Sequence, residues 1–100
     1  MDRVLRWFSM PIGKQMYNIG SEVNRAIKWK NKDDGVKKLN FAIKAIEMLG
    51  LTKNDPKNFG RFDELHFYEC ELIDYILGEN IYQNNDKSIM KSYNQWEHCC

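Results

Sequence analysis

The sequence has no long run of apolar residues, and this absence limits where the protein can reside. A bilayer crossing needs roughly 20 consecutive apolar residues, and no stretch of the chain approaches that length. The first residues, Met1 to Met10, contain neither a long apolar run nor the small-residue cleavage site of a secretory signal. We therefore expect a cytoplasmic protein with no membrane partner.

Cysteine is scarce as well, with three in 100 residues. Cys70, Cys99 and Cys100 are odd in number and two of them are adjacent, so they make a poor disulfide framework and suit a reducing compartment. His98 joins the terminal pair as a soft metal ligand, but no second ligand cluster completes a fourfold site. The Glu-x-x-His pairs of bundle metal sites are also missing. The sequence predicts free thiols and neither a metal nor another cofactor.

Charge of one sign is not in excess. Fifteen Lys and Arg residues stand against fourteen Asp and Glu residues, which leaves a net charge of +1 and no overall field that would attract nucleic acid. The chain is 43% hydrophobic and 29% charged, which is the composition of an ordinary soluble protein. A length of 100 residues is enough for one hydrophobic core. We expect a single domain over residues 1–100.

Apolar residues recur at three- and four-residue spacing in four stretches, and this periodicity predicts four amphipathic helices. The expected apolar stripes are Ile12, Met16, Ile19, Val23, Ala26 and Ile27 in residues 12–30; Val36, Leu39, Ala42, Ile43, Ile46 and Leu49 in residues 36–49; Phe62, Leu65, Leu72, Ile73 and Ile76 in residues 61–77; and Ile89, Tyr93 and Trp96 in residues 86–96.

Polar residues and glycine set the expected helix ends. Asp33 or Asp34 is available to cap the second helix, because a carboxylate accepts hydrogen bonds from the free amides of a first turn. Gly50 is expected to end that helix as a left-handed residue. Asp55 is expected to cap a short turn that begins at Pro56.

The fold class that follows is all-α. The segment before residue 12 contains Val4, Leu5, Trp7 and Phe8, and the sequence leaves open whether it forms a short helix or an apolar arm. Amphipathic helices joined by short connections pack most simply as an antiparallel bundle with their apolar stripes turned inward. We expect an antiparallel bundle of about four helices with a short N-terminal arm or helix.

Glu69 falls in the middle of the apolar stripe of residues 61–77. A carboxylate in that position must find a cation or hydrogen-bond donors, or take up a proton, because an unpaired buried charge is costly. Glu69 is therefore either a structural ion-pair partner, with Lys30 as one candidate cation, or an acid that lines a ligand pocket.

Arg61 and His66 form the spacing Arg-x4-His. In this spacing the chain resembles the HEPN superfamily of small helical-bundle proteins, many of which are ribonucleases of toxin systems or partners of minimal nucleotidyltransferases. The resemblance implies that the Arg and the His converge, usually across a dimer, on the phosphate and ribose 2′-hydroxyl of RNA. There a cation stabilises charge and an imidazole moves a proton near neutral pH. Phe62 departs from the polar residue that often follows the Arg in this family.

A second resemblance covers more of the chain and carries no activity with it. The chain is similar to a group of small uncharacterised bacterial helical proteins in the segments Gly20-Ser21-Glu22-Val23, Arg25-Ala26-Ile27, Trp29, Asp55-Pro56-Lys57-Asn58 and Asp74-Tyr75.

Four large side chains lie away from the expected core stripes, and one of them is Phe67, opposite the stripe of residues 61–77. Phe41 and Met48 are seven residues apart on the opposite side of the second helix, and Trp29 lies on the polar side of the first. A second apolar stripe predicts another buried contact, made by the N-terminal arm, the last helix or another subunit.

These observations lead to one first hypothesis and two alternatives. The first is a non-catalytic interaction module that self-associates or docks on a protein partner through Phe41, Met48 and Trp29. The first alternative is a HEPN-like endoribonuclease or nucleotidyltransferase partner, with RNA as a binding partner only in that case. The second alternative is a ligand-binding bundle that uses Glu69.

Overall fold

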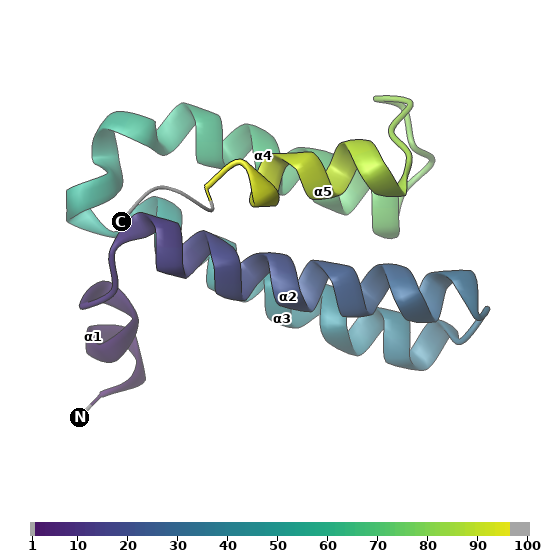
Figure 1. Cartoon of the computed structure of the whole chain (residues 1–100), viewed down its shortest axis with the longest axis horizontal. Coiled ribbons are helices and arrows are strands. Elements are labelled where there is room, and N and C mark those ends of the chain that lie inside the picture. The colour runs from purple at the N-terminus through teal and green to yellow at the C-terminus, as the bar shows by residue number, and fades with distance from the viewer. Residues whose placement is uncertain (1, 97–100) are drawn as a thin grey trace.

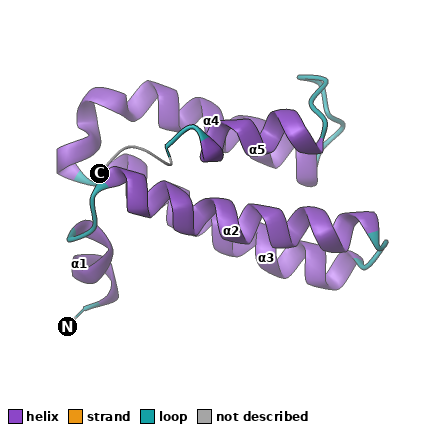
Figure 2. Cartoon of the chain, viewed as in Figure 1, coloured by secondary structure: helices purple, strands orange, loops and turns teal. Residues whose placement is uncertain are grey.

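The computed structural model describes residues 2–96, and within that range it contains helices and no strand (Figure 2). The helices are α1 (Arg3–Phe8), α2 (Ile12–Asn31), α3 (Gly35–Asn54), the 3-10 helix η1 (Pro56–Arg61), α4 (Phe62–Ile76) and α5 (Asp86–Asn94).

The four longer helices form an antiparallel bundle, as the periodicity predicted. α2 and α3 run side by side as one hairpin, and α4 and α5 lie over them as a second pair (Figure 1). α2 packs mainly on α3 and α5, and α4 packs mainly on α3. α1 projects from the end of the bundle where α2 begins (Figure 1), so the segment before residue 12 is a short helix.

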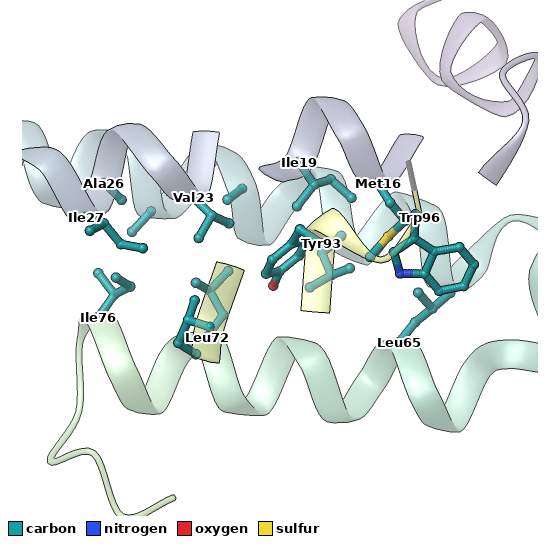
Figure 3. Packing of buried hydrophobic residues seen from close by; sticks show 14 of the residues in the cluster. Met16, Ile19, Val23, Ala26, Ile27, Leu65, Leu72, Ile76, Tyr93 and Trp96 are labelled. Carbon is teal, nitrogen blue, oxygen red and sulfur yellow. The ribbon is translucent and has the colours of Figure 1, made fainter. Parts of the chain in front are cut away.

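The hydrophobic core fills the space between the two helical pairs. Figure 3 shows side chains of α2 facing those of α4, with Tyr93 and Trp96 from the α5 region inserted between them. The expected stripe of α2 is buried from Met16 to Ile27, and the stripe of α5 is buried at Ile89, Tyr93 and Trp96. These two helices present the faces that their sequences predict.

The predicted helix ends are confirmed at two places and wrong at a third. Asp34 caps α3 through the amide of Lys37, and the Asp55 carboxylate accepts from the amide of Lys57 at the start of η1. Gly50 does not end α3, which continues to Asn54. No glycine of the described chain has a positive φ, so Gly50 is an ordinary helical residue. A Cβ at Gly50 would lie 3.9 Å from the Glu69 carboxylate, so this glycine borders α4.

The expected stripes of α3 and α4 are only partly buried. The buried face of α3 is Ala42, Ala45, Leu49 and Thr52, whereas Leu39 and Ile43 are exposed and Val36 is 72% exposed. Small alanine side chains let α3 approach α2 closely, and the larger aliphatic residues are left toward the outside. In α4, Leu65, Leu72 and Ile76 are buried, while Phe62 and Ile73 are exposed.

Candidate functional site

Glu69 forms an ion pair with Lys53 in the seam between α3 and α4. The Lys53 Nζ lies 2.8 Å from the Glu69 Oε1, and each side chain exposes only 15% of its surface. Lys30, which the sequence offered as a candidate cation for Glu69, instead pairs with Asp86 at 3.4 Å, at the start of α5. The charge in the apolar stripe of α4 is therefore balanced by a cation from the last turn of α3.

His66 joins the same cluster through both nitrogens of its ring. Its Nδ1 lies 3.1 Å from the Lys53 Nζ and 3.8 Å from the Glu69 Oε1, and its Nε2 lies 3.7 Å from the Sγ of Cys70. When the lysine ammonium donates to Nδ1, the neutral ring carries its proton on Nε2, directed at the sulfur. The sequence predictions for Glu69 and His66 thus concern one polar cluster.

Arg61 belongs to a different environment from His66. Its guanidinium lies 4.7 Å from the centre of the Trp96 ring and 3.6 Å from a Glu64 carboxylate oxygen. Since His66 is engaged by Lys53 and Cys70, the two residues of the Arg-x4-His spacing have no common hydrogen-bond or ion-pair partner among residues 2–96. The convergence that the HEPN resemblance implies would have to be made between two copies.

The sequence interpretation missed a buried polar network where α1, α2, α3 and η1 meet. Gln15 is fully buried and donates from Nε2 to the Trp7 carbonyl at 2.9 Å and to the Asp55 carboxylate at 3.0 Å. The Asn58 amide donates to the Gln15 Oε1 at 2.9 Å, and the Trp7 indole donates to the Thr52 Oγ1 at 2.9 Å. The sequence feature that could have indicated this network is Gln15, an uncharged polar residue beside Met16 in the apolar stripe of α2.

The carboxylate of Asp55 is stabilised in its ionised form by this network. Burial raises the pKa of Asp55, but hydrogen bonds from the Lys57 side chain and from Gln15 outweigh it, so the pKa lies below its ordinary value. The Lys57 ammonium also donates to the Phe8 carbonyl at 2.7 Å. These bonds tie the end of α1 to η1, so the network has a structural role.

The three residues of the predicted interaction face lie along one side of the α2–α3 hairpin. Phe41 and Met48 are half-buried and pack against the core. Lys37, one turn before Phe41, places its ammonium 4.1 Å from the centre of the Trp29 ring. Lys28 and Lys32 lie 5.3 and 5.2 Å from the same ring, so the partly exposed indole is surrounded by three ammonium groups.

A larger set of exposed apolar side chains lies on the other side of α3. We define the α3/α4 face as Leu39, Ile43, Phe62, Ile73 and Leu77, which expose between 38% and 43% of their surfaces. Leu39, Ile43 and Lys53 lie on the side of α3 that packs on α4. Phe62, Ile73 and Leu77, which directly follows α4, lie on the side of α4 that packs on α3. The face therefore flanks the Lys53–Glu69 ion pair along the outer seam of the two helices.

Comparison with protein-family models, with curated proteins and with solved structures finds no match to this chain. The two resemblances drawn from the sequence therefore stay predictions. Within residues 2–96 no helix combines the length and the apolar character that a bilayer crossing requires.

Proposed function

We propose that the protein is a non-catalytic helical interaction module that self-associates through the α3/α4 face. The observation that carries the proposal is the exposure of five large apolar side chains on two neighbouring helices. Large apolar side chains gathered on one side of two neighbouring helices mark a contact with another macromolecule more often than scattered single residues do. The apolar periodicity assigned every residue of this face except Leu77 to a core, so a second chain would give those residues the burial that their spacing favours.

A second copy is the occupant that fits this surface most simply. Two antiparallel helices with an apolar outer seam are half of a four-helix packing, and a twofold axis supplies the identical half. The charges at the centre of the seam are already paired within each copy, because Lys53 neutralises Glu69 at 2.8 Å. Closing the interface therefore leaves no unpaired charge of this cluster to be desolvated.

The experiment is a measurement of mass by light scattering on two matched variants. Ile43→Glu places a charge on the α3/α4 face and should shift the mass toward that of the 11.9 kDa monomer. Lys44→Glu places the same residue one position further along, on the other side of α3, and should keep the mass of the unmodified protein. Equal masses for the two variants would reject the α3/α4 face as the site of association.

A further inference from the structure

A groove separate from the α3/α4 face lies where α1 meets the α2–α3 hairpin. Its volume is about 720 Å³, and its apolar lining includes Val4 and Trp7 from α1 and Met48 and Leu51 from α3. Pockets that hold small organic molecules have volumes of roughly 300 to 1,000 Å³ and are mostly apolar with a few polar groups. The groove has the size and lining of such a site, and Met48 of the predicted interaction face lies within it.

Glu22 supplies a buried carboxylate at this groove. Its side chain is 12% exposed, and its Oε1 accepts from Arg25 at 2.7 Å. Its Oε2 is buried and has no hydrogen-bond partner in the described part of the chain, residues 2–96. A buried acceptor without a donor is costly, and the cost is greater for an ionised group.

The other charged residues at the groove differ from Glu22 in exposure. Arg3, Lys44 and Glu47 line the groove but are exposed to solvent, which screens their charges. Glu22 is therefore the least exposed of the charged residues that line the groove. Arg25 pairs with its Oε1, and its Oε2 has no donor among residues 2–96. The Glu22 side chain borders the groove, and an ammonium in the groove reaches Oε2 only after a rotation about the last torsion of this side chain.

We propose that this groove binds a small molecule with an apolar body and a protonated amine. The apolar body packs against Trp7, Met48 and Leu51, and the ammonium donates a hydrogen bond to the Glu22 Oε2. Binding is favourable in two ways. The groove removes the apolar body of the ligand from water, and the ligand's ammonium supplies the Glu22 carboxylate with its missing donor. The proposal is independent of self-association, since the groove and the α3/α4 face use different residues.

Two probes of equal length separate the parts of this proposal. Heptylamine carries the ammonium, and heptan-1-ol replaces it with a neutral hydroxyl on the same chain. The indole N–H of Trp7, which donates to Thr52, provides a local NMR signal at the groove. Titration should shift that resonance with both probes, and the amine should bind about tenfold more tightly, the ratio expected for one added charged hydrogen bond.

Variants at two glutamates complete the experiment. Glu22→Gln removes the charge and should bring the two affinities to within about twofold, whereas Glu47→Gln removes a charge of the same sign at the exposed rim and should keep the tenfold preference. Circular dichroism establishes that each variant is folded. An unmoved Trp7 resonance with both probes, equal affinities in the unmodified protein, or a preference that survives in folded Glu22→Gln would each overturn the proposal.

Discussion

Gly20 and Tyr93 are in close contact: a Cβ added to Gly20 would lie 3.0 Å from the Cβ of Tyr93, so one of the two residues would have to shift slightly to accept it. This contact brings α5 against α2, and it places the ring of Tyr93 in the core, where the residue is 3% exposed. Burial raises the pKa of the Tyr93 hydroxyl far above its ordinary range, so this group stays neutral in the folded protein.

The first prediction concerns this contact. Gly20→Ala should lower the free energy of unfolding by about 1 kcal/mol, because crowding against Tyr93 costs more than the better helix propensity of alanine returns. Gly35→Ala is the matched control, since its added Cβ would have no atom of residues 2–96 within 4 Å apart from its chain neighbours and the backbone of its own helix, and it should leave stability unchanged or raise it slightly. Urea denaturation of both variants provides the comparison, and an equal response of the two would show that α2 and α5 are not in close contact.

The Lys53–Glu69 pair should behave as a coupled unit. Lys53→Met removes the cation from a carboxylate that is 15% exposed and should cost about 2 kcal/mol. The double variant Lys53→Met/Glu69→Leu should lie within about 1 kcal/mol of the unmodified protein, because it removes both charges and leaves apolar residues in an apolar seam.

The exposed pair Arg61 and Glu64 gives the reference for that measurement. Its two side chains are 50% and 41% exposed, so a double-mutant cycle on it should yield a coupling energy of only about 0.5 kcal/mol or less. Chemical denaturation gives both values. If the coupling between Lys53 and Glu69 is as small as that of the exposed pair, the seam does not exclude water.

The lowered pKa of Asp55 predicts that the folded protein loses stability in acid. Its pKa is lower in the folded protein than in the unfolded chain, so its contribution is fully present above the ordinary pKa of 3.8 and is lost as the pH falls through the lower folded value. Asp55→Asn should therefore be less stable than the unmodified protein at pH 7, and the difference should shrink below about pH 4. Denaturation curves at several pH values measure this, and a difference that stays constant down to acid pH would contradict it.

The proposed non-catalytic function predicts that the protein does not cleave RNA. The guanidinium of Arg61 and the imidazole of His66 are engaged by different neighbours, Trp96 and Lys53 respectively. Incubation of a single-stranded RNA with the purified protein should leave the RNA intact on a denaturing gel. Cleavage that His66→Ala abolishes without unfolding the protein would instead favour the endoribonuclease alternative.

Local sequence patterns were sufficient to predict most of the fold. Periodicity located every long helix, and the caps at Asp34 and Asp55 follow from the hydrogen bonds that a carboxylate offers to free amides. The rotation of α3 was not predictable in this way, because its buried face contains Ala45 and Thr52, which a hydrophobic pattern ranks below Ile43. Which stripe a helix buries depends on the approach of its neighbours.

The sequence also could not predict which polar residues pair when they lie far apart in the chain. The sequence indicated that Glu69 needs a cation, but only the register of α3 against α4 selects Lys53 over Lys30. In the same way, Gln15 and Asp55 lie forty residues apart and meet because α1, α2 and η1 converge at one end of the bundle. Such contacts are properties of the packed chain and have no local signal.

The mass of the unmodified protein as a function of concentration tests the proposed function most directly. Sedimentation equilibrium should give a mass that rises from 11.9 kDa toward twice that value as the concentration increases. A mass that remains at 11.9 kDa at about 1 mM protein, where even weak dimers are populated, would contradict self-association through the α3/α4 face.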